Sequence, residues 1–456
     1  AYYEDTDLAF RVTQAGYETL YQPRSEIVHF EGMTSGTDLK VGIKKHQVVN
    51  EKKFLARWAD VVRHHGEYGI EPNLEKDRGV RGRILIVDAQ TPLPDRDSGS
   101  LRMFNLMQIF RRLGFKVTFL PSNVANLDGY TAALQRRGIE VLHYPYVNNP
   151  HAYLRQEAAH YDIVLLSRAE IADEMLEIVR KASARPRIIF DTVDLHFVRE
   201  EREARLKNDA SLMRKAHQRR TQELRLASLA DCTLVVSPSE KELIEHALPS
   251  SLVRVVSNIH DVPGCAAPFE DRKDLMFLGG FNHPPNVDAV TYLVNDILPA
   301  IQRRLPDVKL YIVGSEPPEQ IRRLANEHVI VTGFVADLEP YLSRVKISVA
   351  PLRYGAGVKG KINMSLSYGV PVVATQLAVE GMHLESGKDV LAADDAVAFA
   401  DAVVKVYEDG ALWNTLSRNG LAHTERHFSF AAARAAVAAM LDELLPASSH
   451  STGQKT

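Results

Sequence analysis

The stretch "KISVAPLRYGAGVKGKINMSLSYGVPVVAT", residues 346–375, carries the clearest signal for the fold class. Two short apolar runs, 346–351 and 370–375, flank a glycine-rich loop and a segment of helical character. Runs that are apolar on both faces and alternate with helices are typical of strands in a parallel sheet that is covered on both sides. The stretch is therefore predicted to be one strand, helix, strand unit of an α/β fold.

The same alternation occurs in two series along the chain. The apolar runs of the first are 83–87, 116–120, 139–143, 162–166, 187–190 and 233–237, and those of the second are 274–280, 308–314, 328–333, 346–351, 370–375 and 389–393. This predicts two Rossmann-like, doubly wound domains in tandem, which face each other across a cleft between the carboxyl ends of their sheets. The expected divisions are a short first segment 1–38, a helix and linker 39–82, domains 83–260 and 261–428, a helix 429–446 that crosses back, and a disordered tail 447–456.

The amino-acid composition narrows the range of possible functions. The 456 residues are 45% hydrophobic and 25% charged, with a formal net charge of −3, which gives no general attraction for nucleic acid. Only Cys232 and Cys265 occur, so a disulfide framework or a cysteine-based zinc site is excluded. No apolar window is long enough to span a membrane. We expect a cytoplasmic location, with peripheral association at the inner membrane face left open. Because the chain starts at Ala1 inside an acidic motif, it is expected to be a piece of a longer polypeptide.

The glycine-rich loop of the opening stretch predicts an anion site. Gly355, Gly357 and Gly360 let backbone amides approach a ligand closely, and the following helix begins with partial positive charge. Lys359 and Lys361 add full charges, so a phosphate is the expected guest. The alternative is a connecting turn that carries two solvated lysines.

A second loop, in "FLGGFNHPPNVDAV" 277–290, also joins a strand to a helix. Its residues Gly279, Gly280, His283 and Asn286 are predicted to form a second wall of a nucleotide site. The dinucleotide fingerprint G-x-G-x-x-G is missing. A proline-stiffened loop that merely caps a helix is the alternative.

A third loop follows the first strand of the first domain, in "PDRDSGSLRMFNL" 94–106. It is predicted to contact a hydroxylated acceptor, and helix capping by Asp97 and Ser98 explains part of it equally well. The candidate acceptor residues are Asp97, Ser98, Gly99, Ser100 and Arg102.

The fourth candidate is "FDTVDLHFVREEREAR" 190–205, where a strand ends before a charged helix. A carboxylate such as Asp194 beside the imidazole of His196 can orient the ring or raise its basicity, which suits positioning a sugar or assisting proton transfer. A structural histidine at a helix start is the alternative. A metal site is disfavoured because Asp191, Asp194 and His196 lack further evident ligands. The run "REEREAR" is interpreted as a solvated helix face.

Residues 83–445 resemble the retaining family 4 glycosyltransferases of GT-B fold, in the bacterial branch that makes O-antigen and other surface polysaccharides. The motifs that carry the resemblance are "DRDSGSLR", "FDTVDLHFVRE", "GGFNHPPNVDAV", "APLRYGAGVKGK", "YGVPVVAT" and "AVEGM". The resemblance implies that the second domain binds a nucleotide-sugar donor and the first a glycan or lipid-linked glycan acceptor. It also implies that no metal and no cofactor beyond the donor is needed.

Residues 1–38 resemble the end of a family 2 glycosyltransferase of GT-A fold. Glu4 and Asp5 match its catalytic Glu-Asp motif and His29 matches a downstream histidine. The nucleotide-binding strands of that fold would lie upstream, so this remnant is not expected to be an active transferase.

The chain departs from the typical family 4 pattern at the donor site. Ala356 and Met364 stand where typical members have a glutamate pair, the second of which holds the donor ribose. Phe281 and Pro285 stand where they have an arginine and a lysine. One hypothesis is that Lys359 and Lys361 take over the diphosphate. Another is that a dTDP-linked donor suits the missing glutamate, with Glu380 as an alternative ribose partner and UDP- or GDP-linked donors left open.

The expected activity is glycosyl transfer, in which Lys359 stabilises the leaving diphosphate while Asp194 and His196 position the sugar. A nucleotide-sugar epimerase on the same frame is one alternative, because a fold alone does not decide function. A non-catalytic sugar-binding or scaffold module is the other.

Overall fold

The computed structural model describes residues 2–445 apart from 18, 20–24, 29–43 and 68, and it divides into two compact units, Ala1–Val80 and Arg81–Thr456. The predictions about His29 and about the tail 447–456 lie outside the described residues. None of the helices within the described ranges combines the length and apolar character that crossing a membrane requires.

The first unit is built from helices. Phe10 packs edge-on against the rings of Phe54 and Trp58, which are both buried. Asp7 accepts a hydrogen bond of 2.8 Å from the indole Nε1 of Trp58. Its helices are α1 (Glu4–Gln14), α2 (Lys45–Val62) and α3 (Pro72–Glu75). Glu4 lies in the first turn of α1, and the family 2 resemblance of this segment stays a prediction.

The second unit opens with a seven-stranded sheet, all of whose pairings are parallel, in the order β3-β2-β1-β4-β5-β6-β7. Its central strands are apolar on both faces because helices cover both sides, and Ile84 to Val87 are completely buried. The strands are β1 (Gly82–Asp88), β2 (Phe115–Pro121), β3 (Glu140–Val141), β4 (Ile163–Ser167), β5 (Arg187–Asp191), β6 (Cys232–Val235) and β7 (Val253–Val255).

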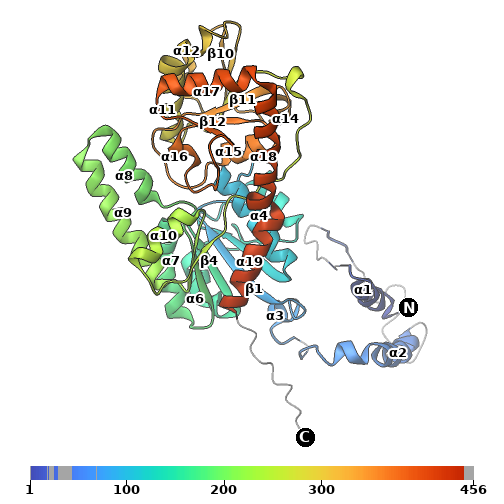
Figure 1. Ribbon diagram of the computed structural model, residues 1–456. Coiled ribbons are helices and arrows are strands. Elements are labelled where there is room, and N and C mark those ends of the chain that lie inside the picture. Colours follow the sequence, from blue (N-terminus) through green and yellow to red (C-terminus); the bar gives the residue numbers. More distant parts are fainter. Residues whose placement is uncertain (1, 18, 20–24, 29–43, 68, 446–456) are drawn as a thin grey trace. The chain divides into compact units, whose positions relative to one another are not determined.

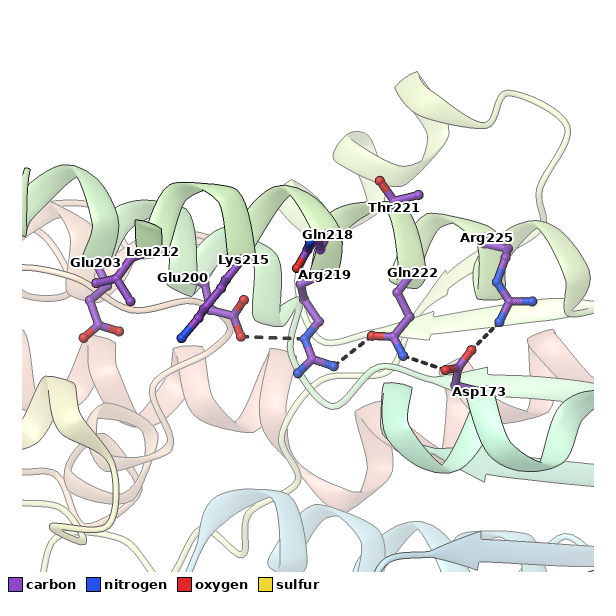
Figure 2. A pocket seen from close by; sticks show the side chains of 10 residues that line it. All are labelled: Asp173, Glu200, Glu203, Leu212, Lys215, Gln218, Arg219, Thr221, Gln222 and Arg225. Atoms are coloured by element: carbon purple, nitrogen blue, oxygen red, sulfur yellow. Dashed lines mark hydrogen bonds and ion pairs between the residues drawn. The ribbon is translucent and has the colours of Figure 1, made fainter. Parts of the chain in front are cut away.

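One helical pair of this domain stands out from the sheet (Figure 1). The pair α8 and α9 is joined at Asn208, which takes a left-handed conformation, and Asp209 caps the start of α9. A row of polar side chains runs along its inner side toward α7 (Figure 2). The helices of the domain are α4 (Ser98–Arg112), α5 (Asp128–Gln135), α6 (Pro150–Glu157), η2 (Ala158–His160), α7 (Ala169–Ala182), α8 (His196–Lys207), α9 (Ala210–Leu229) and α10 (Pro238–Ala247).

A six-stranded parallel sheet follows, in the order β10-β9-β8-β11-β12-β13. Its strands are β8 (Lys273–Leu278), β9 (Leu310–Val313), β10 (Val329–Gly333), β11 (Val345–Ala350), β12 (Val372–Ala374) and β13 (Leu391–Ala392). Its helices are η3 (Phe269–Asp271), α11 (Pro284–Tyr292), η4 (Leu293–Ile297), α12 (Leu298–Gln302), α13 (Glu319–Arg322), α14 (Glu339–Leu342), α15 (Gly360–Ser367), α16 (Gln376–Val379), α17 (Ala396–Glu408) and α18 (Gly410–Phe428). The predicted pair of Rossmann-like parallel sheets is confirmed.

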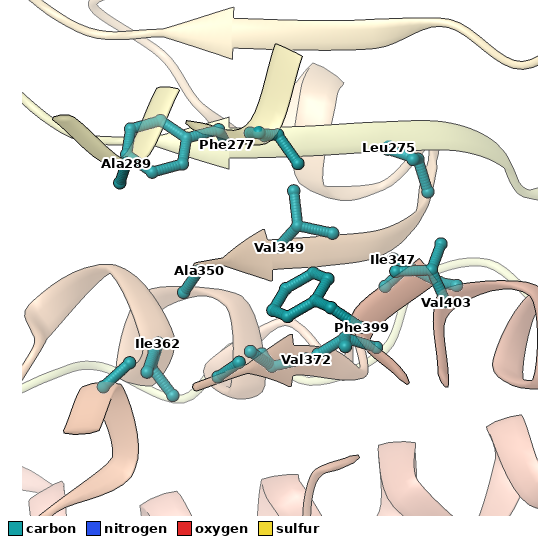
Figure 3. Packing of buried hydrophobic residues seen from close by; sticks show 14 of the residues in the cluster. Leu275, Phe277, Ala289, Ile347, Val349, Ala350, Ile362, Val372, Phe399 and Val403 are labelled. Atoms are coloured by element: carbon teal, nitrogen blue, oxygen red, sulfur yellow. The ribbon is translucent and has the colours of Figure 1, made fainter. Parts of the chain in front are cut away.

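The core of the second sheet is a continuous apolar cluster. Phe277 on β8, Val349 on β11 and Val372 on β12 pack together with Phe399 and Val403 of α17 (Figure 3). All five side chains are at most 1% exposed, and burial of each such side chain contributes about 1.5–3 kcal/mol. This packing holds rigid the strands whose ends carry the candidate loops.

The last helix, α19 (Phe430–Leu444), returns to the first domain. Val437, Met440 and Leu441 join the buried cluster that includes Met103 and Phe110 of α4. The chain thus crosses between the two domains twice, once before β8 and once between α18 and α19.

Both sheets have a switch point where the strand order reverses, between β1 and β4 in the first and between β8 and β11 in the second. Ligands of doubly wound folds bind outside the carboxyl ends of the strands at such points. The loops after β8 and β11 flank the second switch point, and the loop after β1 flanks the first. Three of the four predicted loops are therefore placed where this fold binds ligands.

Candidate functional site

The glycine-rich loop leads from β11 into α15. Gly355 and Gly357 have positive φ angles of 148° and 65°, which only glycine adopts without strain, and α15 starts at Gly360. The Lys359 ammonium folds back over this loop, where its Nζ donates to the carbonyl oxygens of Ala356 at 2.9 Å and Gly357 at 2.5 Å. Burial lowers the pKa of Lys359 to about 8, although the Glu240 carboxylate opposes the shift.

Lys361 connects this loop to the one after β8. Its ammonium donates to the side-chain oxygen of Asn286 and lies 4.3 Å from the ring centre of Phe277. Asn286 in turn donates to the carbonyl oxygen of Gly280 at 2.6 Å. A side chain at Gly279 would lie 2.8 Å from the Lys361 ammonium, so the glycine makes room for the charge. Burial, followed by repulsion from Lys359, lowers the pKa of Lys361 to about 7.

The first domain contributes a carboxylate and imidazole pair. His196 Nε2 lies 3.0 Å from Asp194 Oδ1, and Arg199 donates to the other Asp194 oxygen at 2.6 Å. Burial by itself raises the pKa of Asp194, but the hydrogen bond from His196 and the charge of Arg199 outweigh it and lower the pKa. The pKa of His196 is raised, because its bond to Asp194 outweighs desolvation. The pair therefore favours an anionic carboxylate and a protonated ring.

Two carboxylates hold this pair in place, and sequence reasoning missed both. Glu223 accepts from the backbone N–H groups of His196 at 3.0 Å and Phe197 at 3.1 Å, which caps α8. Glu240 accepts from Leu195 at 3.1 Å. Burial raises the pKa of Glu223 to about 7 and of Glu240 to about 6. No local pattern marks them, because they lie 26 to 45 residues from the groups they cap.

The two domains meet at these loops. A side chain at Gly357 would come within 3.1 Å of Asp194 Cβ, and Asn258 donates to the carbonyl oxygen of Val358 at 3.1 Å. Arg202 of α8 donates to the Gly355 carbonyl oxygen at 2.7 Å and pairs with Glu380 at 2.7 Å. The interpretation of "REEREAR" as a merely solvated helix face is therefore wrong for Arg202, since the fold brings α8 against the glycine-rich loop.

The predicted acceptor residues after β1 have roles in the fold, and acceptor contact by Asp97, Ser98, Gly99 and Ser100 stays a prediction. Asp97 caps α4 by accepting from the backbone N–H of Ser100 at 2.8 Å and from its hydroxyl at 2.7 Å. Ser98 packs directly on Gly360, where a side chain would meet its hydroxyl at 2.0 Å, and Gly99 lies against Val193. The loop fills part of the seam between the domains.

Arg102 requires a correction. It is 1% exposed, pairs with the fully buried Asp191 at 2.8 Å and donates to the carbonyl oxygen of Val256 at 2.9 Å. A guanidinium enclosed in this way has no access to an acceptor, so its role is to tie α4 to β5. The sequence could not reveal this, because Asp191 is 89 residues away.

Two further positions named in the sequence analysis are His283, at the start of α11, and Met364, within α15. His283 is exposed as a residue. Desolvation of its ring by neighbouring protein atoms, together with the charges of Arg199 and Lys361, lowers its pKa to about 4. Met364 packs against the apolar cluster that contains Met276 and Val370. At this position the chain therefore has no carboxylate that could bind a nucleotide.

Taken together, the site has positive charge on one wall and a carboxylate and imidazole pair on the other. Two ammonium groups, a helix start and glycine backbone amides suit a diphosphate. Among the described residues, no three His, Cys, Asp or Glu side chains are gathered as a metal site would require.

Residues 272–409, most of the second domain, match the family model described as "Glycosyl transferases group 1". A curated relative, the "Uncharacterized 44.6 kDa protein in cps region" of Klebsiella pneumoniae, is 24% identical over 140 residues. That match covers 29% of this chain and spans 36% of the length of the relative.

Solved structures share the whole two-domain frame. Sucrose-phosphate synthase (tll1590) of Thermosynechococcus elongatus has a TM-score of 0.62 at 15% identity, covering 81% of this chain and 100% of that one. Anabaena Alr3699/HepE in complex with UDP-glucose has 0.58 at 17%, covering 80% and 100%. A mutant of S. aureus TarM in complex with fondaparinux, alpha-GlcNAc-glycerol and UDP has 0.63 at 9%, covering 79% and 99%.

At such identities the structural likeness establishes the fold, which is that of GT-B glycosyltransferases. The domain that carries Lys359 and Lys361 is similar in sequence to group 1 glycosyltransferases over residues 272–409. The chain thus has a GT-B fold, and most of its second domain resembles that family.

Proposed function

We propose that this chain transfers a sugar from a nucleotide-diphosphate donor to a bacterial surface glycan, with retention of the anomeric configuration. The observation that carries the proposal is the seam itself, where the loop of Lys359 and Lys361 lies against Asp194 and Arg202 of the other domain. A donor held by one wall would place its sugar beside the other. HepE and TarM, whose structures hold UDP or UDP-glucose, support a nucleotide-linked donor.

The donor wall provides for the charge that develops on the leaving group. Departure of a nucleoside diphosphate concentrates negative charge on the β-phosphate. Within the described part of the chain, the two lysines donate to carbonyl and amide oxygens, and a phosphate offers an ammonium a stronger partner than either. The start of α15 adds its partial charge to the same place.

The facing wall orients the sugar and its acceptor. His196 is held by Asp194 through Nε2, which fixes the orientation of its ring beside the carboxylate that packs on the Gly357 loop. In a retaining transfer the acceptor hydroxyl attacks from the side that the diphosphate leaves, and a departing phosphate oxygen takes its proton. His196 then positions the sugar rather than serving as an obligatory base.

The surroundings of Met364 support a proposal for the donor nucleotide. A thioether packed in an apolar cluster cannot accept hydrogen bonds from two ribose hydroxyls, so a donor with a 2′-deoxyribose loses least there. Glu380, the alternative ribose partner, is engaged by Arg202. We therefore propose a dTDP-linked donor, and clearly tighter binding of UDP than of dTDP would refute this.

The wider setting is also a proposal. The relative from a cps region supports a surface glycan as product. Nucleotide sugars and lipid-linked glycans meet at the cytoplasmic face of the membrane, so that is the proposed place of action, with a glycan or lipid-linked glycan as acceptor. The donor is the proposed source of all the chemistry, without a further cofactor.

The deciding experiment is calorimetric titration with UDP, GDP, dTDP and ADP in the presence of EDTA. We expect selective binding of one nucleotide, lost in Lys359→Ala and kept in Lys388→Ala, which removes an exposed lysine of the same domain. Incubation with the matching nucleotide sugar, followed by NMR, then separates the activities. An α-linked product from an α-linked donor supports retaining transfer, an epimerised donor indicates an epimerase, and failure to bind any nucleotide indicates a scaffold.

A further inference from the structure

One sizeable cavity of the described residues lies outside the seam. It is a groove of about 800 Å³ on the inner side of the α8 and α9 pair, bordered by α7 (Figure 2). Pockets that bury drug-sized ligands occupy about 300–1,000 Å³, so this groove has room for a short oligosaccharide rather than one sugar. Of the four stretches that the sequence analysis singled out, only 190–205 contributes to it, through Glu200 and Glu203.

The groove starts beside the candidate catalytic pair. Glu170 of α7 lies 3.9 Å from His196 Nδ1 on one side and 2.8 Å from an Arg219 nitrogen on the other. Arg219 also lies 3.6 Å from Glu200. The Glu170 carboxylate therefore connects the His196 ring to the side chains that line the groove. A chain lying in the groove would point one end at His196.

The walls of the groove are polar and electrically balanced. Three carboxylates (Asp173, Glu200 and Glu203) face three cations (Lys215, Arg219 and Arg225). Such a surface has no net attraction for nucleic acid, anionic lipid or an acidic polymer. It offers many donors and acceptors, which is what a ligand rich in neutral hydroxyl groups requires.

The polar groups are also ordered in advance. Gln222 accepts from Arg219 at 2.9 Å and donates to Asp173 at 2.8 Å, and Arg225 binds the same carboxylate. Figure 2 shows Arg219, Gln222 and Arg225 in one row along α9, with Asp173 of α7 opposite them. Groups that hold one another in place lose little conformational entropy when a ligand binds.

We propose that this groove binds the acceptor, as a neutral oligosaccharide whose growing end reaches His196. The proposal rests on the proposed transferase function and gives the acceptor a site that the 94–106 loop, which is occupied in the domain seam, does not provide. It assigns to α8 and α9 the recognition of the acceptor, while the second domain recognises the donor.

The test blocks the groove without touching the seam. Gln218 and Thr221 line the groove and are exposed, whereas the neighbouring exposed His217 does not line it. Gln218→Trp and Thr221→Trp each fill the groove, and His217→Trp places the same bulk on the same helix outside it. Nucleotide binding and hydrolysis of the nucleotide sugar in the absence of acceptor are measured for all variants, so a folding failure is visible in both.

The probe is a printed array of neutral and acidic microbial glycans, read with the full chain in the presence of the nucleotide that it binds. We expect neutral glycans to bind the unaltered chain and His217→Trp, with binding roughly tenfold or more weaker in both groove variants while donor hydrolysis is unchanged. Preference for acidic glycans, no bound glycan in a chain that hydrolyses its donor, or equal binding by all variants would each overturn the proposal. If the unaltered chain binds no nucleotide, the proposed function is refuted instead.

Discussion

Arg202 is the side chain whose removal should reveal how the two domains share the donor. It donates to the Gly355 carbonyl oxygen at 2.7 Å and pairs with Glu380 at 2.7 Å, so it ties α8 to the glycine-rich loop of the other domain. Arg202→Ala deletes both contacts. The matched control is Arg205→Ala on the same helix, because Arg205 is exposed and pairs only with Glu201 among the described residues.

The two contacts of Arg202 differ in the free energy that they contribute. The Arg202 side chain is 23% exposed, and a hydrogen bond from a charged donor contributes about 1.5–3 kcal/mol. Glu380 is 43% exposed, and an ion pair screened to that extent contributes about 0–1 kcal/mol. Together they contribute about 1.5–4 kcal/mol, and we take the middle, about 2–3 kcal/mol, as the expected cost of Arg202→Ala to the arrangement in which α8 contacts the glycine-rich loop.

Nucleotide affinity is the readout, because the donor needs the loop in place. A cost of about 2–3 kcal/mol weakens nucleotide binding by roughly 30- to 150-fold if the contact between α8 and the glycine-rich loop is fully formed in the bound state. Calorimetry with the nucleotide that binds best should show this loss in Arg202→Ala, a loss of up to about fivefold in Glu380→Ala, and none in Arg205→Ala. Small-angle scattering should show a larger radius of gyration for free Arg202→Ala.

Two results would refute this reasoning. Unchanged affinity in Arg202→Ala would mean that the contact plays no part in donor binding. Equal losses in Arg202→Ala and Glu380→Ala, with no further loss in the double variant, would mean that the ion pair and not the carbonyl bond is responsible.

Three further variants test other parts of the site. The pKa values of Lys361 and Lys359 are lowered to about 7 and about 8, so both ammonium groups lose their protons as the pH rises from 7 to 9. A phosphate ligand that needs both groups protonated should therefore bind at least roughly tenfold less tightly at pH 9 than at pH 7 in calorimetric titrations. Lys361→Arg should make this pH dependence of the affinity weaker. Gly360→Ala, whose added carbon would overlap Ser98, should cost about 1–3 kcal/mol in thermal unfolding and weaken nucleotide binding, and adding Ser98→Gly should restore both. Arg102→Met leaves Asp191 buried without its partner and should lower the free energy of unfolding in urea by about 3–5 kcal/mol; an unchanged stability with a raised KM for acceptor would contradict its structural role.

The strands of both sheets could be predicted from the sequence because burial on both faces requires a continuous run of apolar residues. Each run such as 83–87 or 346–351 is continuous in the chain, so its apolar character can be recognised without knowing its neighbours. β7 (Val253–Val255) was missed, since three residues are too few for such a pattern. The glycines and lysines of 355–361 were found for the same local reason, although their use by a donor stays a proposal.

The two parallel-sheet domains and the loops at their switch points can thus be predicted from local patterns in the chain. The charged side chains that serve those loops cannot, because Arg202 meets its partners 153 and 178 residues further along the chain and Arg102 meets Asp191 at a distance of 89 residues. A surface arginine and a buried one look alike in a sequence. Their difference is set by desolvation and by the partner that folding brings within hydrogen-bond distance, and neither leaves a pattern in neighbouring residues.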